Sequence, residues 1–112
     1  MNISYEEIGA LRVTFPAGGC EAGKVCKIDT SGSAAACVSG DKFCGVVESV
    51  SGSTAGVQIH GFAKVSYTGT APSCGFANLA ANGAGGVAVN SNGRSYLVVK
   101  VDTSALTAII EL

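Results

Sequence analysis

The sequence predicts an all-β protein, a small β-barrel or sandwich-like domain with a short N-terminal arm. Three observations support this prediction. Apolar and polar residues alternate, most cleanly over residues 57–67, and a period of two is typical of a strand with one buried face. Stretches of this kind recur every eight to twelve residues or so, a spacing typical of β-sandwiches and barrels. The 16 glycines fall largely between these stretches, where turns favour glycine.

The bulk composition sets the size of the domain and the character of its surface. At 112 residues the chain is long enough to bury roughly two-thirds of its unfolded surface as one domain. Hydrophobic residues make up 47%, whereas charged residues make up 13%, about half of the usual ~25%. Two interpretations stay open: copies or a partner cover part of the surface, or the surface is rich in small uncharged residues. No tandem repeat or interdomain linker is visible.

Residues 1–15 are predicted to form an N-terminal arm, and residues 16–112 a single β-barrel domain. Ser4 and Glu7 fit a capping box, with Ile3 and Ile8 at the staple positions. Gly9 restricts this helix to one or two turns. The alternating residues 11–15 follow as a strand. The arm is therefore expected to be a short helical turn followed by a strand.

The first half of the domain is expected to end in a central hairpin. Strands are predicted at residues 11–15, 24–29, 34–38 and 43–50, with turns between them. Ser51, Gly52 and Ser53 form the turn into the long alternating stretch 57–67. That stretch is too long for one flat strand, and we expect Gly61 to mark a bend or corner where the chain passes between sheet regions.

The second half continues the pattern of short strands and glycine-rich turns. Residues 76–81 fit either a strand or one helical turn. Further strands are predicted at residues 87–90, 96–102 and 106–112, so the C-terminus is expected to be tied into a sheet.

The charge and hydropathy patterns argue against several classes of partner. The formal net charge is −1, and the seven Lys and Arg residues are scattered, so we expect no nucleic-acid binding. No apolar run is long enough to span a bilayer, and we expect no membrane partner. The acidic start MNISYEE lacks the features of a secretory signal. Synthesis and folding in the cytoplasm are expected.

The five cysteines are expected to be free and mostly buried thiols. Their number is odd, no CxxC is present, and the chain has one histidine, so no common zinc spacing exists. We expect no metal site and no cofactor. The five are Cys20, Cys26, Cys37, Cys44 and Cys74.

Catalytic chemistry has little support in the sequence. His60 lies on the polar side of the central strand beside Phe62, and we interpret it as a surface or interface residue rather than a catalytic one. The glycine-rich turn at residues 82–86 lacks the Lys-Ser/Thr of a phosphate loop. Carboxylates such as Asp29 and Asp102 are explained by turn capping. We therefore expect that the protein is not an enzyme.

Several short motifs carry a resemblance to a known family. They are Thr14-Phe15-x-Ala17-Gly18, Ala22-Gly23-Lys24-Val25, Gly40-Asp41-x-Phe43-x-Gly45-Val46-Val47, Val57-Gln58-x-x-Gly61, Thr68-Gly69, Gly85-Gly86-Val87 and Val98-Val99-x-Val101-Asp102. Over residues 11–112 the chain resembles the decoration, or capsid-cement, proteins of tailed bacteriophages and prophages. The five cysteines are not part of that pattern.

The resemblance implies a structural virion protein that binds the outer surface of an assembled phage head and stabilises it. The implied partner is the major capsid protein, and the implied assembly is a homotrimer. An N-terminal arm that grips the capsid corresponds here to residues 1–15. Its apolar contacts would be Ile3, Tyr5, Ile8, Leu11 and Val13, with His60 and Phe62 as further interface residues. The implied location is the capsid surface, after synthesis in the cytoplasm of a bacterial host.

Two other function classes remain open. One is a β-barrel that binds a small molecule or glycan, with outward-facing Phe62, Tyr67 and Tyr96 as candidate contacts. The other is a thiol-dependent enzyme or redox protein that uses Cys44 or Cys74.

Overall fold

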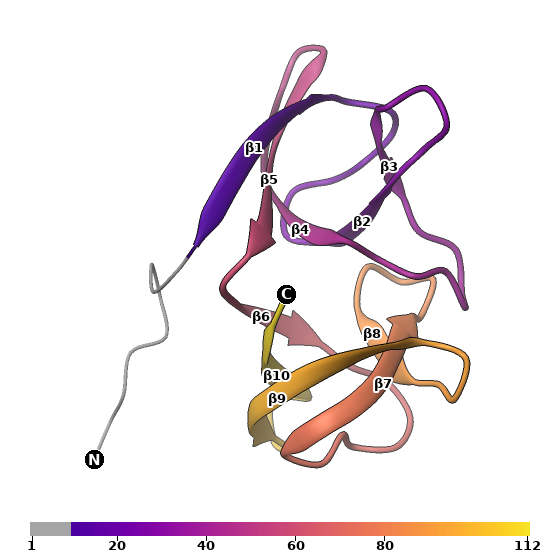
Figure 1. Cartoon of the computed structure of the whole chain (residues 1–112), viewed down its shortest axis with the longest axis vertical. Coiled ribbons are helices and arrows are strands. Elements are labelled where there is room, and N and C mark those ends of the chain that lie inside the picture. The colour runs from indigo at the N-terminus through magenta and orange to yellow at the C-terminus, as the bar shows by residue number, and fades with distance from the viewer. Residues whose placement is uncertain (1–9) are drawn as a thin grey trace.

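Two five-stranded antiparallel sheets, one above the other in Figure 1, form a β-sandwich-like fold. The structure is a computed structural model and describes residues 10–112. Within these residues the protein is all-β, with 56% of residues in strands and no helix. The predicted fold class is confirmed. The helical turn expected near Ser4 lies outside the described residues.

The first sheet is built from residues 11–60 and has the order β1-β5-β4-β2-β3. Its strands are β1 (Leu11–Pro16), β2 (Val25–Ile28), β3 (Ala34–Ala36), β4 (Gly45–Ser51) and β5 (Thr54–His60). The predicted central hairpin is confirmed, because β4 pairs with β5 across Gly52 and Ser53. Residues 11–15 of the expected arm belong to this sheet, since β1 pairs along its length with β5.

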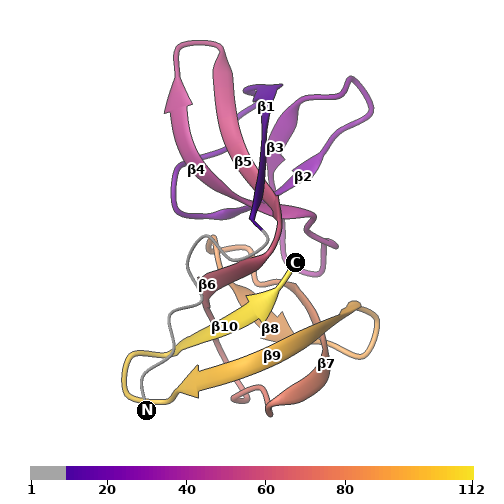
Figure 2. The same ribbon diagram turned by 60° about the vertical axis from the view of Figure 1, so that its left-hand side comes forward.

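The second sheet is built from residues 62–111 and has the order β6-β10-β9-β7-β8. Its strands are β6 (Phe62–Ser66), β7 (Gly75–Ala81), β8 (Val87–Val89), β9 (Arg94–Asp102) and β10 (Thr107–Glu111). The strand alternative for residues 76–81 is therefore confirmed over the helical one. In Figure 2 the chain passes from β5 in the upper sheet directly to β6 in the lower sheet.

Gly61 is the corner between the two sheets, as the sequence predicts. It is the one residue between β5 and β6, and its φ is 91°. An L-residue with a side chain is disfavoured at such a φ, whereas glycine adopts it freely. The amide of Leu112, which follows β10, donates to the Gly61 carbonyl at 2.9 Å and ties the C-terminus to the corner.

The two halves of the chain have the same topology, which the sequence did not lead us to expect. Adding five to each strand number of the first sheet reproduces the order of the second sheet. In each sheet the two edge strands also approach each other at one parallel bridge, and this bridge lies at equivalent positions in the two halves. Ala17, directly after β1, bridges Ala34 at the start of β3, and Tyr67, directly after β6, bridges Val87 at the start of β8.

The repeat extends to the loops of equivalent hairpins. Asp29 begins the β2–β3 loop and Asn82 begins the β7–β8 loop. Each side-chain oxygen accepts hydrogen bonds from the amides two and four residues later, at 2.8 to 3.1 Å. Each loop also has a glycine of positive φ three residues after the capping residue, Gly32 and Gly85. Loops with the same capping pattern and the same glycine position therefore connect the strands of the two hairpins.

Irregularities in the strands recur at equivalent positions too. In the pairing of β4 with β5, Glu48 is the extra residue, between the partners of Val57 and Gly56. In the pairing of β9 with β10, Val99 is the extra residue in the same way. A β-bulge bends and twists its strand locally. The same bulge in both halves gives the two sheets related curvature.

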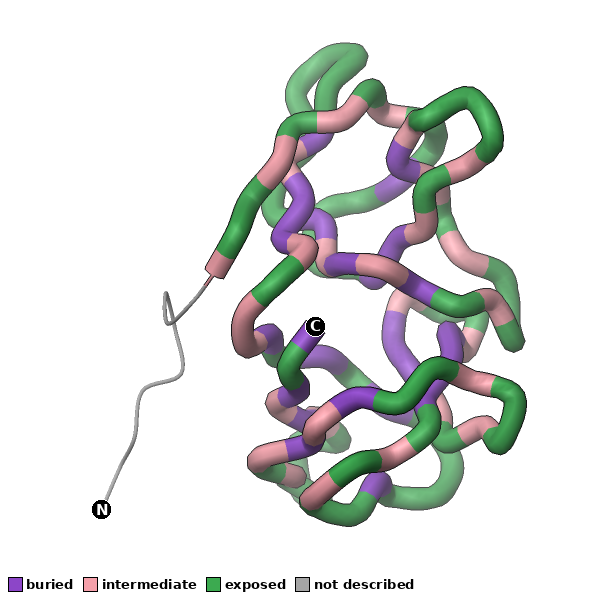
Figure 3. Tube along the Cα trace, viewed as in Figure 1, coloured by how far each residue is buried: buried purple, intermediate pink, exposed green. Residues whose placement is uncertain are grey.

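The core is divided into two clusters, seen as the purple inner segments in Figure 3. The smaller cluster lies within the first half: Cys20, Cys26, Ala34, Val47, Ala55 and Val57. The larger cluster holds the second half's buried residues together with Val25 and Phe43 of the first half. The first half thus contributes side chains to the core of the second.

Phe43 is the main aromatic contact between the halves. Its ring stacks on that of Tyr96, with the centroids 4.6 Å apart and the planes 5° from parallel. The Tyr96 hydroxyl donates to the Phe43 carbonyl at 2.5 Å. Close by, the backbone amides of Gly40 and Ala81 donate across the junction to the Ala81 and Asp41 carbonyls, at 2.9 and 2.8 Å. Stacking and hydrogen bonding together fix how the halves sit.

Candidate functional site

The strand of the predicted N-terminal arm lies at the edge of the first sheet. β1 is the terminal strand in the sheet order, hydrogen-bonded to β5. Of the predicted arm contacts, Leu11 is 48% exposed on β1 and Val13 is half-buried. Ile3, Tyr5 and Ile8 lie outside the described residues. An edge strand presents backbone donors and acceptors that can pair with another chain.

The structure brings the described arm residues next to the predicted interface residues. Leu11 is paired with His60 at the end of β5, and Phe62 follows across the Gly61 corner. His60 is exposed and Phe62 is half-buried. Phe62 also lines a groove between the two sheets, which we call the corner groove, whereas Leu11, Val13 and His60 are not among its lining residues.

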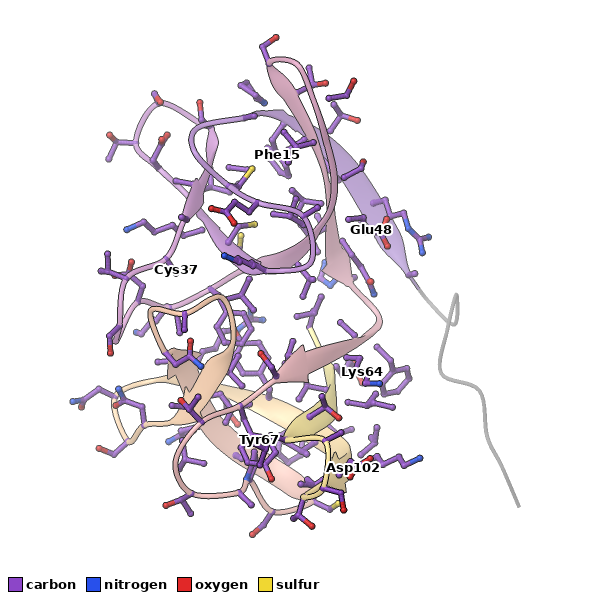
Figure 4. All side chains as sticks on the ribbon, turned by 180° about the vertical axis from the view of Figure 1, so that it is seen from behind. Phe15, Cys37, Glu48, Lys64, Tyr67 and Asp102 are labelled. Atoms are coloured by element: carbon purple, nitrogen blue, oxygen red, sulfur yellow. The ribbon has the colours of Figure 1, made fainter. Side chains whose placement is uncertain are left out.

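The corner groove is open and has a volume of about 320 Å³. Its lining comes from β1, β4 and β5 of the first sheet and β6 of the second: Arg12, Val46, Glu48, Gln58, Phe62, Ala63 and Lys64. Figure 4 shows Glu48 on the upper half and Lys64 on the lower half along the same side of the molecule. A chain bound here would contact both halves.

The charges of the corner groove are mixed. The Arg12 Nε donates to Glu48 Oε2 at 2.5 Å, with both side chains more than a third exposed. Lys64 is exposed on β6. The lining includes no serine, cysteine or histidine, so it offers hydrogen bonds, charge and an aromatic surface rather than a nucleophile. This chemistry suits recognition of a polypeptide segment.

Gln58 is a structural residue of the site that sequence reasoning missed. Its place in the alternation of β5 predicts an outward position, but the side chain is only 8% exposed. The Nε2 group donates to the carbonyls of His60 at 3.0 Å and Phe62 at 2.9 Å. A buried amide needs such partners. Gln58 therefore bridges the two sides of the Gly61 corner and shapes the floor of the groove.

The outward positions expected for Tyr67 and Tyr96 are wrong. The two side chains are 3% and 2% exposed, and both belong to the larger core cluster. Tyr96 points inward because its ring stacks on Phe43, and burial raises the pKa of its hydroxyl. These residues therefore form no exposed aromatic platform for a glycan.

The cysteines are free, two of them belong to the smaller core cluster, and Cys37 packs against the larger one. Cys20 and Cys26 are buried, Cys37 and Cys44 are half-buried, and Cys74 is exposed. A hydrogen bond from Cys26 lowers the pKa of the Cys44 thiol to about 7, and the same contact raises that of Cys26. Desolvation raises the pKa of Cys37 to about 11. Cys44 is thus the cysteine whose environment favours the thiolate.

Two further features bear on ligands and membranes. Among residues 10–112, no group of three or more His, Cys, Asp or Glu side chains is placed to hold a metal ion. The same part of the chain contains no helix that is long and apolar enough to cross a membrane.

Comparisons of the chain with protein-family models, with curated proteins and with solved structures found no match.

Proposed function

We propose that this protein decorates the outer surface of an assembled phage head and stabilises the shell. The observation that carries the proposal is the position of β1: the strand of the N-terminal arm is an edge strand, and its Arg12 lines the corner groove. The sequence resemblance supplies the class of partner, the major capsid protein. The proposal places the protein in the virion, as a homotrimer with a structural role.

Binding would combine backbone pairing with side-chain contacts. A strand of the capsid subunit can add to the outer edge of β1 through main-chain hydrogen bonds, while the groove receives side chains against Phe62, Arg12 and Glu48. A ligand that binds the assembled shell but not dissociated subunits stabilises the shell by mass action. Trivalent attachment raises the avidity of individually weak contacts.

Deletion of residues 1–10 tests the proposal. The variant retains β1 and should keep its fold, but it should lose sedimentation with expanded heads. Phe62→Ala should weaken the same binding at least tenfold, whereas Val50→Ser, at the distant β4–β5 turn, should bind as the wild type does. Folding is monitored by circular dichroism. Full binding by both the truncated chain and Phe62→Ala would refute the proposal.

A thiol-exchange function is the second candidate, favoured by the Cys26–Cys44 pair. The Cys44 thiolate would attack one sulfur of a small-molecule disulfide, releasing one thiolate and leaving a mixed disulfide on Cys44. Attack by deprotonated Cys26 on the Cys44 sulfur would then release the second thiol and form a Cys26–Cys44 disulfide. Alkylation of native protein should then modify Cys44 with an apparent pKa of about 7. Modification of exposed Cys74 alone would exclude this candidate.

A further inference from the structure

At the junction between the two halves, the second half packs against Val25 on β2 of the first sheet. Val25 and Val46 are cross-strand partners on β2 and β4. Val25 is 3% exposed and belongs to the larger core cluster, against which Val46 also packs. The Val25 amide donates to the Gly85 carbonyl at 3.0 Å, so the β7–β8 loop lies against Val25, whereas Val46 also lines the corner groove. The second half therefore buries Val25 on the first sheet.

The equivalent position of the second sheet is uncovered. Leu97 lies two residues before the extra residue Val99 of β9, as Val46 lies two residues before Glu48 of β4. The cross-strand partner of Leu97 is Phe76 on β7, and that of Val46 is Val25 on β2. The next pair along these strands is Ala77 with Tyr96, which corresponds to Cys26 with Gly45 in the first half. Ala77 and Tyr96 both pack into the larger core cluster. Phe76 is 80% exposed, the largest exposure among the exposed large apolar residues of the described chain.

A shallow groove runs beside Phe76. It has a volume of about 200 Å³ and is lined by Phe76, Arg94, Ser95, Tyr96, Leu97, Glu111 and Leu112. The two halves differ in the length of a loop near the junction. Residues 37–44 connect β3 to β4 and bring Phe43 to the junction, whereas only residues 90–93 connect β8 to β9. Among the described residues, Phe76 is exposed at the position where Val25 is buried on the first sheet.

The first half carries a loop equivalent to the one that lies against Val25. The β7–β8 loop, which covers Val25, corresponds to the β2–β3 loop with the same capping pattern. Beside this loop, Ile28 is 37% exposed. The loop carries the Asp29 carboxylate where the second half has Asn82, and the Phe76 groove carries the Arg94 guanidinium as well as the Glu111 carboxylate. Asp29 and Arg94 have opposite charges, so these two side chains can pair across the contact.

We propose that the Phe76 groove of one copy receives the β2–β3 loop of a second copy, head to tail. The contact would repeat between molecules the junction that joins the two halves within one molecule. Each copy has one groove and one loop, so the contact is heterologous, and copies join into a ring if the rotation between them closes. Burial of Phe76 and Ile28 supplies the apolar driving force. The inference gives the expected self-association a surface, and it does not depend on capsid binding.

Paired variants of the purified full chain test this proposal in analytical ultracentrifugation. Phe76→Glu removes the groove and Ile28→Glu removes the loop end, so each variant alone should associate at least tenfold more weakly than the wild type. A mixture of the two should recover a dimer and stop there, because each variant contributes one intact end. Val50→Glu, at a position 41% exposed near the end of β4, should behave as the wild type.

Three outcomes would overturn the proposal. They are a wild-type chain that stays monomeric up to about millimolar concentration, normal assembly of Phe76→Glu, and a mixture that gives no dimer. Normal assembly of Ile28→Glu with loss in Phe76→Glu would indicate a symmetric contact through Phe76 and would also refute the head-to-tail arrangement. Thermal unfolding checks that each variant folds, and the Ser variants at the same positions replace any that does not. Head binding is measured separately, so either proposal can fail alone.

Discussion

Replacement of Gln58 by leucine should weaken the corner between the sheets. The side chain is 8% exposed, and its Nε2 group donates to the carbonyls on both sides of Gly61. Leucine has a similar volume but no donor, so it fills the space and leaves both carbonyls without these bonds. The substitution therefore isolates the hydrogen bonds from packing.

The magnitude follows from the two bonds. A hydrogen bond contributes a net free energy of about 1 kcal/mol, so the loss of two should lower the free energy of unfolding by about 2 kcal/mol. For a domain of this size, 1 kcal/mol corresponds to a shift in Tm of roughly 4 °C, and the expected decrease is about 8 °C. Urea unfolding should show the same loss with an unchanged slope.

Lys64→Leu is the matched control for Gln58→Leu. It introduces leucine into the same groove, at an exposed position on β6. A surface substitution of this kind should change the free energy of unfolding by less than about 0.5 kcal/mol. If Gln58→Leu lowered the Tm by no more than the control does, the two bonds would not hold the corner, and the reasoning would be refuted.

Three further predictions concern the backbone and one ion pair. Gly61→Ala should cost about 1–2 kcal/mol in urea unfolding because of the φ of 91°, and an unchanged midpoint would contradict the strained corner. Leu106 has a φ of 57°, a conformation that asparagine tolerates better than leucine does. Leu106→Asn should therefore raise the Tm, and a lower Tm would show that contacts of the leucine side chain contribute more to stability than the backbone strain costs. The hydrogen bond from Lys27 Nζ at 2.7 Å holds the pKa of Asp41 below its usual range, helped by the Val38 amide. The resulting stabilisation is present above the unfolded pKa of about 3.9 and is lost as the pH falls through the folded pKa. Asp41→Asn should therefore be less stable than the wild type at pH 7, with the gap closing toward about pH 2, and a constant gap in urea unfolding would rule out this linkage.

Much of the predictable detail in this chain is local. The alternation of residues 57–67 and the glycine in its middle were enough to predict two strands and a corner, because period and backbone conformation are properties of neighbouring residues. The candidate site was predicted in part for the same reason: His60 and Phe62 lie next to that corner. Their meeting with Leu11 depends on the pairing of β1 with β5, which joins residues far apart in the sequence.

The sequence by itself determined the all-β class, nearly every strand and the turn at Gly61. Only the tertiary structure decided which strands pair, and thus revealed that the two halves share one topology. Few identities mark the repeat, such as Thr54-Ala55 and Thr107-Ala108 at the starts of β5 and β10. Register and sheet order depend on contacts between distant residues, which different side chains can satisfy equally well. Burial of Gln58 and Tyr96, against exposure of Phe76, was decided in the same way, by what packs against each face.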